Sequence, residues 1–324
     1  MTDSPDQKCL EGVVLRVDAK VCHVQIEDSG ETVTRQFPIA GKLFEHRSRE
    51  KNPVAVGDRV RVLVDEAGDG AIQSVLPRIS RLARRSKNDE DREQVLAANL
   101  SLVLICSALR DPPMQALLID RLLAGCSREG IDAALVLTKL DRDKHKTGEA
   151  WKELYEDLGY PVFLTSIQKG KETPESLEAI RDLLSKNVTM LSGLSGVGKS
   201  SLINALAPGL DLRVGNMSRI RQGKHTTSHT QLIPLPFGGH VLDTPGIRNF
   251  GLFGVGSREL GFWYRDIAEV AKECPFRNCS HTHEPDCAVV QAVENLELAP
   301  TRYASYLKIR EDLVRDEERE RLGE

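Results

Sequence analysis

Polar and apolar positions alternate through the first part of the chain, residues 1–76. Short alternating or β-branched runs are separated by turn formers such as Asp28-Ser29-Gly30 and Gly68-Asp69-Gly70. Alternation with a period of two is typical of strands that bury one face. The predicted strands are Gly12–Val17, Val21–Ile26, Thr32–Phe37, Asp58–Val64 and Ala71–Leu76. Short strands spaced this closely predict a small β-barrel, for which we favour the oligonucleotide-binding type.

The next stretch, residues 77–98, is basic at its start. Arg78–Lys87 contains Arg78, Arg81, Arg84, Arg85 and Lys87 and no acidic residue. Two interpretations are open. The stretch is a solvated linker between domains, or it contacts RNA phosphates.

The pattern changes at residue 99, where apolar runs alternate with segments of helical period. The predicted strands are Leu100–Cys106, Asp132–Leu137, Pro161–Leu164 and Val188–Leu191. The predicted helices run from Pro112 to about Arg128 and over Thr147–Leu158, Pro174–Ser185 and Lys199–Leu206. This alternation predicts a mostly parallel, doubly wound α/β domain over residues 99–255. Residues 256–324 are expected to be helical and to end in a charged helix, Leu296–Leu322.

Composition is consistent with a multidomain globular protein. The chain has 324 residues, 40% of them hydrophobic and 28% charged, which suits two or three domains. No apolar run is long enough for a membrane span, and Met1–Lys8 lacks the apolar core of a signal peptide. We therefore expect a cytoplasmic protein with no membrane partner. The net charge of −4 does not by itself indicate a nucleic-acid partner.

The segment Gly193–Ser200 fits the pattern G-x-x-x-x-G-K-[ST] of a phosphate-binding loop. It follows a predicted strand and opens a predicted helix, which is the context that the motif requires. The glycines let backbone N–H groups point at the phosphates, Lys199 supplies a positive charge, and the Ser200 hydroxyl is the expected Mg²⁺ ligand. The residues expected to bind nucleotide here are Gly193, Leu194, Ser195, Gly196, Val197, Gly198, Lys199, Ser200 and Ser201.

Two further segments are expected to sense the γ-phosphate. Asp243-Thr244-Pro245-Gly246 follows the apolar pair Val241-Leu242 and matches D-x-x-G. Asp243 would lie near Mg²⁺, and the backbone N–H of Gly246 would face the phosphate. Between this motif and the phosphate loop lies the polar segment Gly223–Ser228, in which a threonine could bind Mg²⁺ as a switch loop does. Thr226 and Thr227 both stay candidates.

A guanine-reading element, Thr138-Lys139-Leu140-Asp141, resembles N-K-x-D. The Asp141 carboxylate can accept two N–H groups from guanine that adenine does not offer. Thr138 stands where Asn is usual, so one bond to the base or to the phosphate loop would be lost. Ser166, after a predicted strand, is expected to add a contact to the base. The element precedes the phosphate loop in the chain, whereas ordinary GTPases place it afterwards.

The residue that positions the attacking water is not the usual one. Many GTPases have Gln directly after D-x-x-G, but this chain has Ile247, which cannot orient water. Hydrolysis must use another group, be slow, or be completed by a partner. His225 is the candidate catalytic residue, and an ordinary exposed histidine is the alternative.

Cysteine and histidine residues cluster near the C-terminus. Cys274, Cys279, His281 and Cys287 supply the Cys₃His set of a closed structural Zn²⁺ site. His283 is an alternative fourth ligand that spacing alone does not exclude. Because four ligands leave no open position for substrate, we interpret the zinc as structural.

Together these motifs closely resemble the ribosome small-subunit-dependent GTPase A family of bacteria, whose GTPase domain is circularly permuted. The resemblance covers almost the whole chain. It rests on the phosphate loop, the preceding Thr138–Asp141, Gly223–Thr227, Asp243–Gly246 and the cysteine cluster. The family pattern favours His281 over His283, and His225 matches a proposed switch-loop histidine.

The resemblance implies an oligonucleotide-binding barrel (1–76), a basic linker (77–98), a permuted GTPase domain (99–255) and a helical zinc-binding domain (256–324). It also implies GTP hydrolysis stimulated by the small ribosomal subunit, rRNA binding, and a role in late maturation of that subunit. We expect a monomer that binds GTP or GDP with Mg²⁺ and acts beside other assembly factors. The alternative is an RNA-binding zinc protein whose nucleotide site only stabilises the fold. A phosphate-loop kinase is weaker, because it explains neither Asp141 nor the rotated order.

Overall fold

The computed structural model of the protein describes residues 8–45, 52–65, 68–86, 89–210, 230–243 and 255–322. Contacts divide the chain into two units, each assembled from separate stretches of sequence. The first draws on Met1–Leu102, Arg181–Leu191 and Leu206–Ile247. The second draws on Val103–Ile180, Ser192–Ala205 and Arg248–Glu324.

The first unit begins with antiparallel strands in the order β5-β4-β1-β2-β3. They are β1 (Lys8–Asp18), β2 (Val21–Asp28), β3 (Glu31–Pro38), β4 (Arg59–Val64) and β5 (Gly70–Val75), and helix α1 (Lys42–Glu45) follows β3. The alternation in the sequence turns one face of each strand inward, and Val14, Val24 and Val60 are fully buried. Ile39 bridges Ile72 and so links the two ends of the series. The strands agree with the predicted ones, and the oligonucleotide-binding class stays a prediction.

The same unit contains three later strands, β11 (Val188–Ser192), β12 (Gln231–Pro234) and β13 (His240–Asp243). β11 and β13 are parallel, with Met190 beside Leu242, whereas β12 is antiparallel to β13. β12 also pairs with β1. The sheet is therefore mixed, and the parallel pair places Asp243 at the strand end from which the phosphate loop leaves.

Part of the predicted linker is folded. β6 (Arg81–Ser86) and β7 (Asp89–Ala98) pair in the antiparallel sense as the two strands of a hairpin. Charged residues predominate in this part of the sequence, so the few apolar positions did not indicate strands. Among them, Leu82, Val95 and Ala97 are buried. Just before the hairpin, Arg78 Nε and Nη2 donate to the fully buried carboxylate of Asp58 at 2.7 and 2.8 Å. Arg78 therefore holds the unit together, which neither interpretation of the basic stretch had proposed.

The second unit has neighbouring strands in the order β10-β9-β8. These are β8 (Leu102–Ala108), β9 (Asp132–Thr138) and β10 (Val162–Leu164), accompanied by α2 (Ala116–Glu129), α3 (Thr147–Glu156), α4 (Pro174–Ser185) and α5 (Lys199–Leu206). Every residue of β8 is buried, as expected for a strand covered on both faces. β9 and β10 are parallel with Leu137 beside Leu164, so Thr138 and Thr165 meet at one edge of the sheet.

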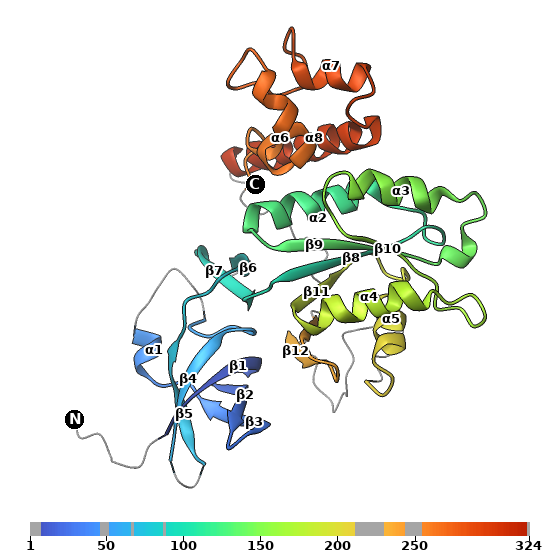
Figure 1. The fold of residues 1–324 in the computed structure, drawn as a ribbon. Coiled ribbons are helices and arrows are strands. Elements are labelled where there is room, and N and C mark those ends of the chain that lie inside the picture. The colour runs from blue at the N-terminus through green and yellow to red at the C-terminus, as the bar shows by residue number, and fades with distance from the viewer. Residues whose placement is uncertain are drawn as a thin grey trace. The chain divides into compact units, whose positions relative to one another are not determined.

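The last part of the second unit is helical, with α6 (Arg265–Val270), α7 (Ala288–Glu294) and α8 (Pro300–Leu322). Short 3₁₀ turns occur at Leu140–Arg142, Leu260–Trp263 and Ala271–Glu273. α8 begins at Pro300, later than predicted, because proline suits the first turn of a helix. α8 lies along α2 (Figure 1), and Ala124 of α2 belongs to the same apolar core as Ile309. Among the helices that the structure describes, none is both long and apolar enough to cross a bilayer.

Candidate functional site

The phosphate loop has the conformation that its sequence predicts. It leaves β11 and leads into α5, whose first residue is Lys199. Gly193, Gly196 and Gly198 all have positive φ angles. At Gly193 (φ +135°) a Cβ would lie 2.0 Å from the backbone oxygen of Cys106, so only glycine fits. Leu194, Ser195 and Gly196 are exposed, which leaves the turn open to a ligand.

Lys199 folds back over this loop. Its Nζ donates to the carbonyl oxygens of Gly193 and Leu194 at 2.7 and 2.8 Å. Burial lowers the pKa of Lys199, and the nearby Cys106 works in the opposite direction. An ammonium group held by neutral carbonyls can exchange them for phosphate oxygens, which bind it more strongly. Ser200 is buried beside it, at the start of α5.

The guanine element lies directly after β9. Thr138 is buried, and its Oγ1 donates to the carbonyl of Val197 in the phosphate loop at 2.5 Å. The backbone N–H of Leu140 donates to Thr165 O at 3.0 Å, which joins the element to the end of β10. A threonine in place of asparagine predicts the loss of one bond, either to the base or to the phosphate loop. The structure shows that the bond to the phosphate loop is present.

Asp141 is oriented before any ligand arrives. Ser166 Oγ donates to Asp141 Oδ1 at 3.1 Å and accepts the N–H of Gln168 at 3.3 Å. Thr173 closes this loop, since its N–H donates to Ser166 O at 3.1 Å. The Asp141 side chain is only 8% exposed, which fits a carboxylate that faces a cavity rather than bulk water.

One cavity of about 450 Å³ joins the two motifs. Its lining residues come from the guanine element, from the loop after β10 and from the phosphate loop with α5. They are Thr138, Lys139, Asp141, Arg142, Thr165, Ile167, Gln168, Val197, Gly198, Ser201 and Leu202. Segments separated by almost 60 positions in the sequence thus converge on one space. Its volume lies in the range typical of small-ligand sites.

Five lining residues are not among the site residues named from the sequence: Arg142, Thr165, Ile167, Gln168 and Leu202. Ile167 is 40% exposed, which is unusual for a large apolar side chain. Ile167 directly follows Ser166, the predicted contact to the base. This adjacency was the signal in the sequence that could have identified it as a residue beside a flat apolar ligand. Arg142 follows Asp141, and its Nη1 pairs with the Asp111 carboxylate at 3.4 Å. Lys139 Nζ also turns to this loop and donates to Asp111 O.

The structure describes only some of the residues that are predicted to bind Mg²⁺ and to sense the γ-phosphate. The backbone of Asp243 ends β13, and its side chain lies outside the described residues. Thr226, Thr227, Gly246 and the candidate catalytic His225 lie outside them as well.

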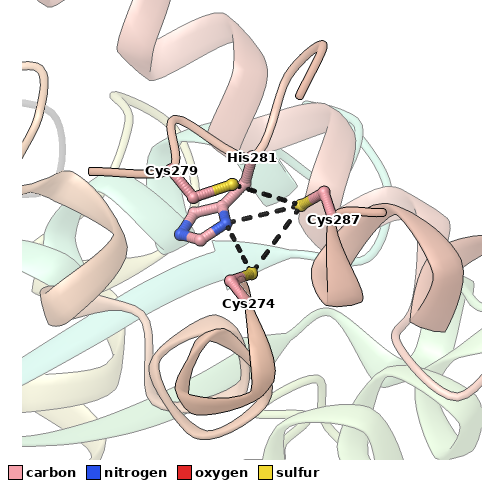
Figure 2. Close-up of side chains that lie close together, drawn as sticks. All are labelled: Cys274, Cys279, His281 and Cys287. Atoms are coloured by element: carbon pink, nitrogen blue, oxygen red, sulfur yellow. Dashed lines mark hydrogen bonds between the residues drawn. The ribbon is translucent and has the colours of Figure 1, made fainter. Parts of the chain in front are cut away.

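The four predicted zinc ligands do meet. Figure 2 shows the three thiol groups and the His281 ring converging on one point. Nδ1 of His281 lies 3.6 Å from Sγ of both Cys274 and Cys287. The Sγ atom of Cys287 is 3.6 Å from that of Cys279 and 3.9 Å from that of Cys274. The Nδ1 atom of His283 instead contacts the Thr282 hydroxyl at 2.7 Å, and this side chain is not in the cluster.

These distances fit a tetrahedral zinc ion. Bonds of about 2.3 Å to sulfur and about 2.0 Å to nitrogen place two sulfurs roughly 3.8 Å apart and sulfur and nitrogen roughly 3.5 Å apart. Burial lowers the pKa of His281, which keeps the imidazole neutral and able to bind a metal. Burial and the neighbouring thiols of Cys287 and Cys274 raise the pKa of Cys279, so a cation is what would favour three thiolates together.

Neighbouring groups hold the ligand loop in place. Tyr303 Oη donates to His281 O at 2.8 Å, and Tyr306 Oη donates to Ser280 O at 2.9 Å. Glu284 accepts the N–H groups of Ser280 at 2.7 Å and of Thr282 at 3.2 Å. Burial raises the pKa of Glu284, but these bonds outweigh it and the pKa falls well below its ordinary value.

Comparison with known proteins gives a consistent result. A model of the RsgA GTPase family matches residues 75–253. Proteins named small ribosomal subunit biogenesis GTPase RsgA are 35% identical in Bacteroides fragilis and 39% identical in Gemmatimonas aurantiaca. Both alignments cover 94% of this chain and 97% of the relative.

Two solved structures resemble the whole chain. YjeQ from Thermotoga maritima has a TM-score of 0.77 at 30% identity, covering 95% of this chain and 99% of that one. YloQ, described as a circularly permuted GTPase, has a TM-score of 0.75 at 28% identity, covering 98% and 99%. The similarity therefore extends over almost the whole chain, from the strands β1–β5 to the cysteine cluster.

Proposed function

Because the chain belongs to the RsgA GTPase family, we propose that it hydrolyses GTP as an assembly factor of the small ribosomal subunit. The observation that carries this proposal is the cavity shared by Asp141 and the phosphate loop. A guanine base fits beside Asp141 and Ser166, with the phosphates directed along the loop toward Lys199. The chain order of these elements agrees with the permuted order of the family.

The residues of the cavity account for guanine selection. The Asp141 carboxylate accepts the two N–H groups that guanine presents on one edge, and adenine would leave it without donors. Ser166 holds this carboxylate in place, so little ordering is needed on binding. Ser201 and Leu202 line the same cavity at the start of α5, where backbone N–H groups favour anions.

Hydrolysis would need magnesium and a group that positions water. Mg²⁺ would stabilise the charge that develops on the β- and γ-phosphates. The Ser200 hydroxyl, the Asp243 carboxylate and Thr226 or Thr227 are the residues proposed to hold it. Since Ile247 cannot orient water, we assign that role to His225 and expect slow turnover until the small subunit binds.

The zinc cluster is proposed to be structural. Cys274, Cys279, His281 and Cys287 complete a tetrahedron, so no position is left for a substrate. rRNA binding, late action in maturation, a monomeric state and a cytoplasmic location follow from the family and are proposed on the same basis.

GTP turnover tests the proposal. We expect wild-type turnover to rise when purified small subunits are added. Ser200→Ala should lower the stimulated rate by about 100-fold or more, because it removes a magnesium ligand. Ser185→Ala is a matched control at the end of α4, where its hydroxyl bonds only to Asp182 O.

Equal, negligible rates of GTP turnover for wild type and Ser200→Ala, with and without subunits, would contradict the proposed GTPase activity. That result would support the alternative, an RNA-binding zinc protein with a structural nucleotide site.

A further inference from the structure

The first two turns of α8 contact both the loop that carries the zinc cluster and the helices α2 and α6. Arg302, at the start of this helix, is only 2% exposed. Its Nε and Nη2 donate to the two carboxylate oxygens of Asp266 in α6, each at 2.9 Å. Its Nη1 donates to Asp120 in the middle of α2. A single buried guanidinium therefore joins three helices.

Asp120 extends this network toward the guanine element. Its side chain is fully buried, and its Oδ1 also accepts the hydroxyl of Tyr155 in α3 at 3.0 Å. α3 directly follows Thr138–Asp141 in the chain, and Asp143 binds its first turn through the N–H of Gly148 at 2.7 Å. Asp120 therefore connects Arg302 to α3, the helix that follows the guanine element in the chain.

Two tyrosines in the same turns of α8 support the zinc loop. Tyr303 and Tyr306 donate to the carbonyls of His281 and Ser280. The Tyr306 ring packs edge-on against Tyr264, with centroids 5.6 Å apart, and Arg302 lies 4.5 Å over the Tyr264 ring. The zinc loop and the charge network therefore share α8 and Tyr264.

The chemistry of Arg302 makes this connection strong. Burial opposes its charge, but the hydrogen bonds of Asp266 and the charge of Asp120 raise the pKa of Arg302, so it stays ionised. Removing one partner from such a pair leaves a buried charge uncompensated, which is strongly unfavourable. If α8 loosened, Asp120 would lose its counter-ion and α2 would lose the apolar surface that packs on it.

We propose that the zinc cluster and the guanine-nucleotide cavity are energetically coupled through Arg302, Tyr303 and Tyr306 of α8. Loss of zinc weakens nucleotide binding, and bound nucleotide strengthens zinc retention by the same factor, since such coupling is reciprocal. The inference rests on the proposed function, because it requires both ligands to bind where proposed.

The test uses the full chain, GDP carrying a fluorescent group as the nucleotide probe, and a colorimetric chelator as the zinc probe. In wild type we expect zinc removal to weaken GDP binding by about tenfold. We expect saturating GDP to raise the chelator concentration needed to extract half of the zinc by a similar factor.

Arg302→Met should reduce this coupling to less than twofold, because it removes the link while keeping much of the side-chain volume. Arg315→Met is the matched control, since Arg315 lies on the same helix and forms an exposed pair with Glu311 at 2.8 Å. It should leave the coupling unchanged. Tyr303→Phe should weaken zinc retention and leave GDP affinity of the zinc-loaded protein within twofold.

The wild-type measurement decides the matter even if Arg302→Met does not fold. A GDP affinity that is equal within twofold in zinc-loaded and zinc-free protein would overturn the coupling and leave the proposed function intact. Failure of the zinc-loaded wild type to bind GDP at all would overturn the proposed function and this inference with it.

Discussion

At the scale of single residues, Thr138 shows how one hydroxyl can serve a position where a larger amide is usual. A threonine hydroxyl has one hydrogen to donate. That hydrogen is directed to Val197 O at 2.5 Å, with Ser107 O farther away at 3.4 Å. The side chain therefore keeps the guanine element attached to the phosphate loop. Unlike Asn, Thr138 has no second polar group on its side chain that could also contact the base.

Thr138→Val should weaken GDP binding by about tenfold, because the Val197 carbonyl would lose its donor at a cost of about 1–3 kcal/mol. Fluorescence titration with GDP measures the effect. Thr189→Val is a matched control, since the Thr189 hydroxyl is buried without a hydrogen-bond partner among the described residues. It should bind GDP normally, and an equal loss in both variants would refute the role of the Thr138 bond.

At the scale of elements, the segment between β9 and α3 is ordered by its own short side chains. Asp143 Oδ2 accepts the N–H of Gly148 at 2.7 Å, and Oδ1 accepts the hydroxyl of Thr147 at 3.0 Å. These bonds satisfy groups that the first turn of α3 would otherwise leave free. Burial raises the pKa of Asp143, but the bonds from Gly148 and Thr147 together lower it below its ordinary value.

A depressed pKa stabilises the folded state at pH values above the unfolded-state pKa of 3.8, and the stabilisation is lost as pH falls through the folded value. Asp143→Ala should therefore lower the free energy of unfolding by about 1 kcal/mol at pH 7. Urea denaturation at pH 7 and below pH 4 measures it.

Asp143→Asn removes the titrating charge, while its single amide oxygen can still accept one of the two bonds, such as that from the N–H of Gly148. The stability difference between wild type and Asp143→Asn should shrink as pH falls below 3.8. A difference that stays constant over this range would show that the carboxylate charge does not contribute.

At the scale of the whole molecule, the helical C-terminal part has an apolar core that adjoins the cysteine cluster. Its core combines buried side chains such as Leu260, Ile267 and Ile309 with the ligand Cys287. A small apolar core of this kind is commonly completed by a structural metal. The same core contains Cys287 of the cysteine cluster, Ala124 of α2 and Ile309 of α8, so the cluster and the α2–α8 contact share one apolar core.

Cys279→Ala should abolish stoichiometric zinc binding and lower the thermal unfolding midpoint of the chain by about 5–10 °C. Metal analysis and calorimetry measure the two effects. Cys9→Ala is the control, because Cys9 is exposed and lies outside the cluster. It should retain one zinc per chain, and one zinc per chain in Cys279→Ala would show that the ion binds elsewhere.

The sequence by itself determined the local chemistry of this protein. The phosphate loop, the guanine element and the cysteine cluster were each predicted from closely spaced residues, because such motifs depend on backbone turns that nearby glycines and short spacings specify. The alternating strands of residues 8–75 and most helix positions also followed from local periodicity. The similarity to known proteins confirmed the family that these motifs indicated.

Only the tertiary structure decided which distant groups meet. It directed Thr138 to Val197, paired Arg78 with Asp58, and buried Arg302 between Asp120 and Asp266. It also turned most of a predicted linker into the hairpin of β6 and β7. The physical reason is that hydrophobic periodicity records which side of an element is buried, whereas a hydrogen bond or ion pair between distant segments depends on how those elements pack.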